Sequence, residues 1–98
     1  MFARVTAFQL KIDEVDEAVN VYKEELIPAR QEGEGVSGGY LLVDRKTGKA
    51  IAVTLWDRAE YNTASETSRY YAKPLDKFKS HFESRPVDLG LYEVCTQG

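Results

Sequence analysis

The chain has 98 residues, and its 13 Lys and Arg against 16 Asp and Glu give a formal charge of −3. An apolar fraction of 43% is ordinary for a globular domain and excludes global disorder or a collagen-like repeat. No window approaches the roughly 18 apolar residues of a membrane helix, and no signal-peptide pattern is visible at the start. A pI near 5.1 argues against nucleic acid as the main partner. We therefore expect one domain over residues 1–98.

The numbers of cysteines and histidines limit the disulfides and metal sites that the chain can form. Cys95 is the single cysteine, which excludes an internal disulfide and favours a reducing compartment such as the cytoplasm. No second His or Cys stands at metal-ligand spacing from His81, so we expect no transition-metal site and no bound cofactor.

The first half of the chain predicts a strand, a helix and a hairpin. Residues 2–12 are β-branched and aromatic without Gly or Pro, which is typical of a strand. Apolar residues at helical spacing predict a helix over residues 14–27, with Pro28 at its end or kink. Residues 36–45 and 49–57 are expected to be two strands joined by a three-residue turn that contains Gly48.

The second half predicts a longer helical segment and a last strand. A mostly apolar series, with Ser68 as its one polar member, alternates at spacings of three and four from Tyr61 to Phe82, which indicates a helix over roughly 58–83. Pro74 lies inside that segment and predicts a kink or two abutting helices. Residues 87–96 complete the order β-α-β-β-α-β. This order predicts an α+β, ferredoxin-like fold with a four-stranded antiparallel sheet and both helices on one face.

Both faces of the predicted sheet are apolar. In the third strand, for example, Ile51, Val53 and Leu55 alternate with Ala52, Thr54 and Trp56. An uncovered sheet face with about eight such side chains would be a large apolar patch for a monomer. We therefore expect a homodimer in which two open sheet faces meet. The alternative is a buried central strand pair with only the edges exposed to water.

The chain resembles the antibiotic biosynthesis monooxygenase-like domains of the dimeric α/β-barrel superfamily, over nearly its whole length. The motifs that carry the resemblance are, in chain order, YKEELIP at 22–28, GVSG at 35–38, DRKTGK at 44–49, LWD at 55–57 with AE at 59–60, and the segment 68–82 broken at Pro74. The resemblance implies a dimeric α/β barrel with a pocket in each subunit between sheet and helices. It also implies that Trp56 lines that pocket.

The function implied by the resemblance is cofactor-independent oxygenation of an aromatic or quinone-like small molecule. Trp56 would form a stacking wall, with Tyr40, Tyr61 and Tyr71 as further ligand-binding candidates. Tyr40 shares the face of Trp56 only if the hairpin loop has three residues, because a shift of one residue reverses the face. His81 is the only conventional general base, and no other catalytic residue is assigned.

Each candidate also has a purely structural interpretation. Trp56, Tyr61 and Tyr71 can be core residues, and His81 can be a partly exposed surface residue. The alternative function is a non-catalytic homodimer that binds a small hydrophobic ligand or serves in assembly. Haem-degrading members of that family carry an Asn on the first strand and a His soon after the Trp. Neither residue is present at these positions in this sequence. Binding of haem would be detected by a Soret absorption band.

Overall fold

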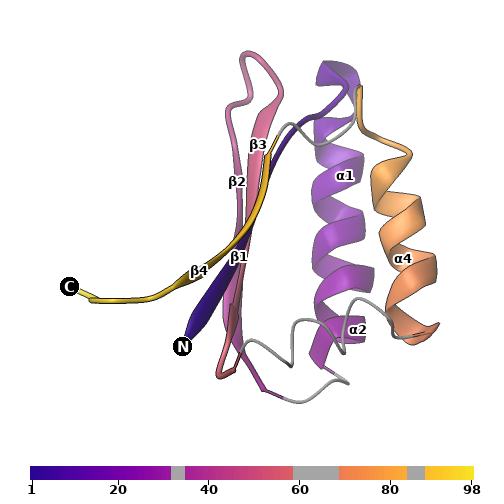
Figure 1. Ribbon diagram of the computed structural model, residues 1–98. Coiled ribbons are helices and arrows are strands. Elements are labelled where there is room, and N and C mark those ends of the chain that lie inside the picture. The colour runs from indigo at the N-terminus through magenta and orange to yellow at the C-terminus, as the bar shows by residue number, and fades with distance from the viewer. Residues whose placement is uncertain (32–34, 59–68, 84–87) are drawn as a thin grey trace.

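Four antiparallel strands form one sheet, with helices on one of its faces (Figure 1). The computed structural model describes residues 1–31, 35–58, 69–83 and 88–98. The strand order is β2-β3-β1-β4, as expected for the ferredoxin-like arrangement. The strands are β1 (Phe2–Gln9), β2 (Val36–Val43), β3 (Lys49–Trp56) and β4 (Asp88–Glu93). The helices are η1 (Ile12–Glu14), α1 (Val15–Val21), η2 (Tyr22–Leu26), α2 (Ile27–Gln31) and α4 (Arg69–Lys79).

The first helix continues through Pro28 instead of ending there. A proline has no N–H, and in a regular α-helix its ring collides with the carbonyl four residues earlier. The turn before Pro28 is a π-helix, η2, and the N–H of Ile27 donates to the carbonyl of Tyr22 five residues back. This wider turn lets the helix accommodate the proline and reach Gln31. Pro74 likewise lies inside the described helix α4. None of the helices among the described residues is long and apolar enough to span a membrane.

The β2–β3 hairpin has a four-residue loop, so the expected three-residue loop is wrong. Val43 lies opposite Ala50, and the N–H of Asp44 donates to the carbonyl of Lys49 at 2.8 Å. The Asp44 carboxylate accepts the N–H of Lys46 at 2.9 Å, and its carbonyl accepts the N–H of Gly48 at 2.8 Å. These bonds hold residues 45–48 in the loop, with Gly48 at a φ of 79°.

This register reverses the expected position of Tyr40. Tyr40 lies opposite Val53 instead of Thr54, and its side chain is 61% exposed. It therefore lies on the open face of the sheet, and the expectation that it shares the face of Trp56 is wrong. The cause is the one extra loop residue, since each step of register moves every side chain of a strand to the other face.

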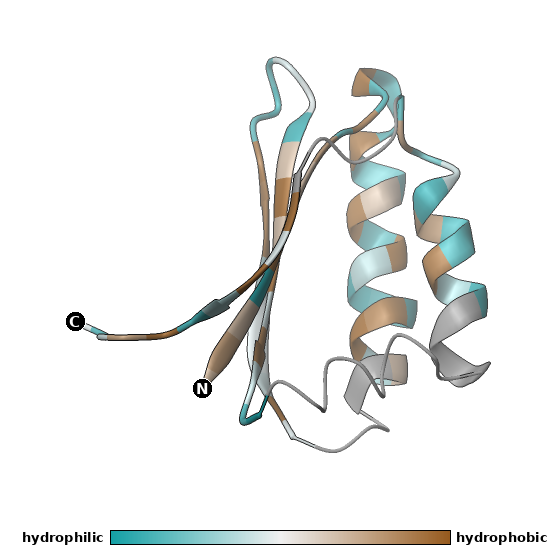
Figure 2. Ribbon diagram, viewed as in Figure 1, coloured by the Kyte–Doolittle hydropathy of each residue, from teal (hydrophilic) through white to brown (hydrophobic). Residues whose placement is uncertain are grey.

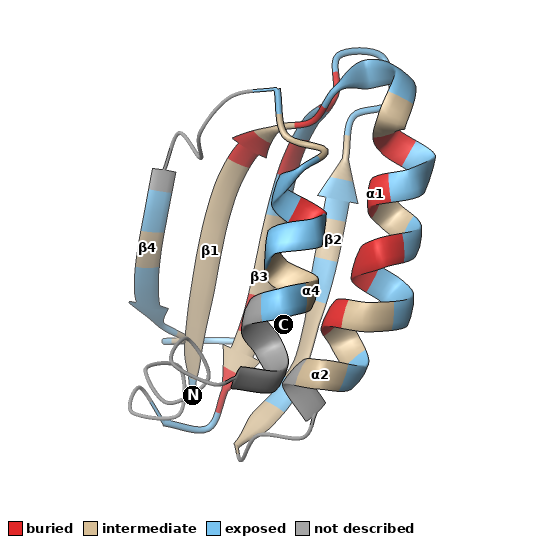
Figure 3. Ribbon diagram, turned by 90° about the vertical axis from the view of Figure 1, so that its right-hand side faces the viewer, coloured by how far each residue is buried: buried red, intermediate tan, exposed pale blue. Residues whose placement is uncertain are grey.

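The hydrophobic core lies between the helices and the half of the sheet that includes the β2–β3 hairpin. Figure 3 shows the buried residues along α1, and Figure 2 shows apolar residues on its sheet-facing side. Phe8 is 3% exposed, stacks on Phe82 with a centroid distance of 4.4 Å, and meets the edge of Phe78 at 5.5 Å. The other core residues are Leu10, Val15, Ala18, Val21, Tyr22, Leu26 and Ala50.

No described helix covers the opposite face of the sheet (Figure 1), and this face carries apolar side chains. Register places Val5, Ile51 and Val53 on this face, together with Tyr40 and Tyr92 from the flanking strands. Ile51 is 41% exposed and Tyr92 is 53% exposed. The expectation that both sheet faces are apolar is therefore confirmed for the described strands.

Candidate functional site

Trp56 lies at the end of β3, on the sheet face that meets the helices. It is opposite Phe2 on β1 and Val36 on β2, and only 2% of it is exposed. Its indole Nε1 is buried, and no described residue accepts a hydrogen bond from it. Trp56 is also outside the continuous core around Phe8. A buried donor without an acceptor costs about 1–3 kcal/mol, so this position calls for a reason beyond packing.

Arg4 and Thr54 form the next row along the same face. They lie directly opposite each other on β1 and β3, two residues from Phe2 and Trp56 respectively. Thr54 is 8% exposed, and the Nε atom of Arg4 is buried. The inward face at this end of the sheet therefore carries a guanidinium, a hydroxyl and an indole N–H, and the exposed Glu93 lies opposite Phe2 at its β4 edge.

Arg4 is not among the site residues expected from the sequence. The signal was present, because strand side chains alternate and Arg4 shares its parity with Phe2 and Phe8. A charged residue on the sheet face that meets the helices is an unusual placement that indicates a specific polar role.

Within the described part of the chain, none of the three tyrosine candidates has a side chain placed beside Trp56. Tyr40 lies on the other face, as shown above. Tyr61 lies outside the described residues. Tyr71 belongs to α4, and its side chain is outside the described part of the chain. The ligand-binding roles of Tyr61 and Tyr71 therefore stay predictions.

His81 lies at the opposite end of the sheet from Trp56. Its carbonyl accepts the N–H of Lys11 at 2.9 Å, just beyond the end of β1, whereas Trp56 is opposite the first residue of β1. The seven residue steps from Phe2 to Gln9 alone span about 23 Å along a strand. His81 is therefore separated from Trp56, and a base role toward a ligand at Trp56 does not fit this structure.

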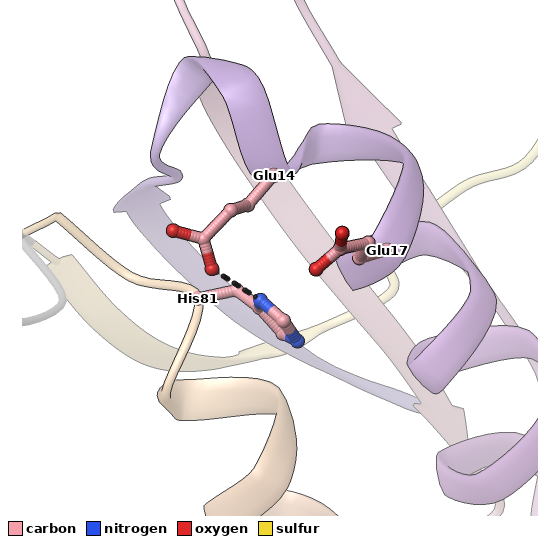
Figure 4. A group of neighbouring side chains, drawn as sticks. All are labelled: Glu14, Glu17 and His81. Carbon is pink, nitrogen blue, oxygen red and sulfur yellow. Dashed lines mark hydrogen bonds and ion pairs between the residues drawn. The ribbon is translucent and has the colours of Figure 1, made fainter.

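His81 instead forms an ion-paired cluster with the start of the first helix (Figure 4). Its Nδ1 lies 2.8 Å from Oε1 of Glu14, and Lys11 Nζ lies 3.7 Å from the other Glu14 oxygen. The hydrogen bond with His81 holds the pKa of Glu14 below its ordinary value, and the charges of Lys11 and His81 act in the same direction. The carboxylate of Glu17 completes a group whose ligand-type atoms all lie within 4.8 Å of one another.

A separate hollow of about 650 Å³ lies near the β2–β3 hairpin, away from Trp56. Its residues include Leu42, Ile51 and Ala7 from the open face, with Gln9 and Lys49 at its edge. Its lining is mainly apolar, and it joins the uncovered surface described above.

The sequence relatives are longer proteins of Mycobacterium tuberculosis. The uncharacterized protein Rv2557 is 32% identical over 88 residues, which is 89% of this chain and 38% of the relative. The uncharacterized protein Rv2558 is 35% identical over 65 residues, which is 66% of this chain and 28% of the relative. The chain thus spans less than two fifths of the length of the curated relatives it matches. No protein-family profile matches the sequence.

Solved structures share the whole architecture. The crystal structure of an antibiotic biosynthesis monooxygenase covers 98% of this chain and 100% of its own, with a TM-score of 0.78 at 16% identity. The chain has the antibiotic biosynthesis monooxygenase fold. SnoaB, a cofactor-independent oxygenase from Streptomyces nogalater, covers 98% of this chain and 94% of its own, with a TM-score of 0.79 at 13% identity. A conserved protein from Methanosarcina mazei gives 0.80 at 15% identity, over 94% of this chain and 90% of its own. The resemblance noted in the sequence is therefore confirmed at the level of the fold.

Proposed function

We propose that this domain binds a planar aromatic or quinone-like molecule against Trp56, between the sheet and the helices, and oxygenates it without a cofactor. The observation that carries the proposal is the buried indole N–H of Trp56, which has no acceptor among the described residues. A ligand carbonyl that stacks near the indole would accept this hydrogen bond. The shared fold with SnoaB supports the reaction class by analogy.

Arg4 and Thr54 suit the anionic form of such a ligand. A phenol or an acidic C–H flanked by aromatic rings becomes negatively charged when it loses its proton. The guanidinium of Arg4 and the hydroxyl of Thr54, in the row beside Trp56, would stabilise that charge in a site shielded from water. The domain would thereby favour the carbanion, which is the form that reacts with oxygen.

The proposed reaction balances without an added reductant. A ring methylene loses a proton, and the resulting carbanion donates electrons to O₂. One oxygen atom stays on the carbon as a carbonyl and the other leaves as water, so that R₂CH₂ and O₂ give R₂C=O and H₂O. The protein's part is to orient the ring, exclude bulk water and stabilise the anion.

We also propose that two chains associate through their open sheet faces. Tyr40, Leu42, Ile51 and Tyr92 are between 41% and 61% exposed on that face. Full burial of one such side chain is worth about 1.5–3 kcal/mol, so a second copy with the same face would gain substantial stability. Because both copies would use the same apolar face, a twofold symmetric dimer is the simplest assembly that covers it.

A second candidate function is ligand binding or assembly without catalysis. It is favoured by one observation, the distance of His81 from Trp56. Among the described residues, the single conventional general base in the rows of Trp56 and Thr54 is Glu93, which lies opposite Phe2 on the edge strand β4 and is exposed to solvent. This candidate predicts ligand binding at Trp56 with no oxygen consumption.

Tryptophan fluorescence tests the proposed site directly, because Trp56 is the single tryptophan. We expect a hydroxyanthrone to quench this fluorescence and to be converted to the anthraquinone, with one O₂ consumed per product. Trp56→Phe should slow turnover about tenfold, because stacking and one hydrogen bond together are worth about 1–3 kcal/mol. Spontaneous oxidation is subtracted using protein-free samples.

The same assays on Arg4→Met test the role of the guanidinium, and Arg45→Met is the matched control. Arg45 is exposed and pairs with Asp16 at 2.6 Å on the protein surface. We expect Arg4→Met to weaken quenching and turnover, and Arg45→Met to leave both unchanged. Quenching without oxygen uptake would select the non-catalytic function. Absence of quenching by anthrone and anthraquinone alike would reject the Trp56 site.

A further inference from the structure

The strongest unassigned feature is the group formed by Glu14, Glu17 and His81 (Figure 4). Glu14 ends η1 and Glu17 lies in the first turn of α1, whereas His81 follows α4 more than 60 residues later. Folding alone brings these side chains together, and Figure 4 shows both carboxylates close to the imidazole ring. The group lies far from Trp56 and is independent of the function proposed above.

The positions of the ligand-type atoms fit a small divalent ion. Two ligands of one tetrahedral Zn²⁺ are roughly 3.3 Å apart, given metal–ligand distances of about 2.0–2.1 Å. Nδ1 of His81 and Oε1 of Glu14 are 2.8 Å apart, close to this separation. Because a carboxylate only accepts hydrogen bonds, Nδ1 carries the shared proton, and an ion that enters between the two atoms would replace that proton.

The backbone around His81 is held in place. Its carbonyl accepts the N–H of Lys11 at 2.9 Å, and the carbonyl of Lys11 accepts the N–H of Glu14 at 2.9 Å. The next residue, Phe82, pairs with Leu10 and stacks on Phe8 in the core. The side chain of His81 is 12% exposed, whereas Glu17 is exposed and can move toward an ion. Glu14 and His81 are thus preorganised as ligands, whereas Glu17 can adjust its position.

The local charge also favours a cation. Once an ion has displaced the proton of His81, the ionised carboxylates of Glu14 and Glu17 carry two negative charges, and only Lys11, 3.7 Å from Glu14, opposes them with one positive charge. We propose that Glu14, Glu17 and His81 form a binding site for a divalent transition-metal ion, best matched by Zn²⁺, with water as a further ligand. One nitrogen and two carboxylates suit zinc, whereas Mg²⁺ prefers a shell of oxygen ligands.

Calorimetric titration of tag-free protein with ZnCl₂ tests the site. The background is Cys95→Ser, because Cys95 is an exposed thiol that could bind zinc by itself. We expect one zinc per chain, proton release on binding, and no binding of MgCl₂. Co²⁺ should give the visible absorption of a tetrahedral nitrogen and oxygen site.

Matched variants identify the ligands. Glu17→Gln should weaken zinc binding at least tenfold, and the control Glu24→Gln, at another exposed glutamate of the same helical segment, should leave it unchanged. His81→Ala should abolish binding, and circular dichroism checks its fold. Lys11→Met should tighten binding roughly twofold to fivefold, since it removes a competing ion pair. Zinc binding that survives both Glu17→Gln and His81→Ala, or no zinc binding at all, would overturn the proposal.

Discussion

Tyr40 lies directly opposite Val53 across β2 and β3, and its side chain is 61% exposed on the sheet face that the helices leave open. This pairing places an aromatic ring on the edge strand β2, at one side of the apolar open face. The same surface includes Leu42 and Ile51, and the hollow near the hairpin opens beside them. We expect the proposed second copy of the chain to dock on this surface.

Tyr40→Lys is expected to separate the proposed dimer into monomers. A lysine at this position would bury its charge against the partner's apolar face, which costs far more than it gains. Sedimentation velocity should show the 11.1 kDa chain as a dimer, and the variant as a monomer. Ile12→Lys is the control, because Ile12 is 57% exposed in η1, away from the sheet face. A wild-type monomer at micromolar concentration would contradict the dimer.

Phe8→Ala should destabilise the domain by about 3–5 kcal/mol, the usual loss for a large buried aromatic residue. Phe8 is 3% exposed and contacts both Phe78 and Phe82. The measurement is the free energy of unfolding in urea. As a comparison, Ile12→Ala removes an exposed side chain and should change that free energy by less than about 0.5 kcal/mol. If both substitutions lowered the free energy of unfolding by the same amount, Phe8 would not be a core residue.

Gly48→Ala should destabilise the hairpin more than Gly38→Ala. Both glycines have positive φ angles, 79° and 146°, which disfavour any side chain. A Cβ at Gly48 would also lie 2.6 Å from the carbonyl oxygen of Leu10, whereas one at Gly38 would meet nothing within 4 Å. We expect a loss of more than about 1–2 kcal/mol at Gly48, the cost of a left-handed residue alone. Thermal unfolding of the two variants gives the comparison, and a Gly48→Ala protein as stable as the wild type would contradict the loop conformation.

Glu14→Gln should make metal-free protein less sensitive to acid. The folded-state pKa of Glu14 is lowered by its hydrogen bond with His81, so the ionised carboxylate stabilises the fold at pH values above the unfolded pKa of about 4.3. That stabilisation is lost as the pH falls below this value and through the folded-state pKa. Unfolding measured with EDTA between pH 6 and pH 3 should show a smaller loss of stability in Glu14→Gln than in wild type. Glu24→Gln serves as the control, and identical pH profiles for all three proteins would argue against the pair.

The sequence by itself determined the elements, their order and the apolar character of both sheet faces. These properties depend on local periodicity, which each segment carries independently: two residues for a strand such as β3, and 3.6 for the α-helices. Alternation in β3 also placed Trp56 on the same face as Ala50 and Thr54, and the structure has that face toward the helices.

Only the tertiary structure decided the hairpin register, the position of His81 and the meeting of His81 with Glu14. The loop around Gly48 has one more residue than the sequence pattern suggested, because the carbonyl and carboxylate of Asp44 bind backbone N–H groups within the turn. That single step moved Tyr40 to the open face. His81 and Glu14 are 67 residues apart in the sequence, and contacts at such separations come from the packing of whole elements, which no local pattern encodes.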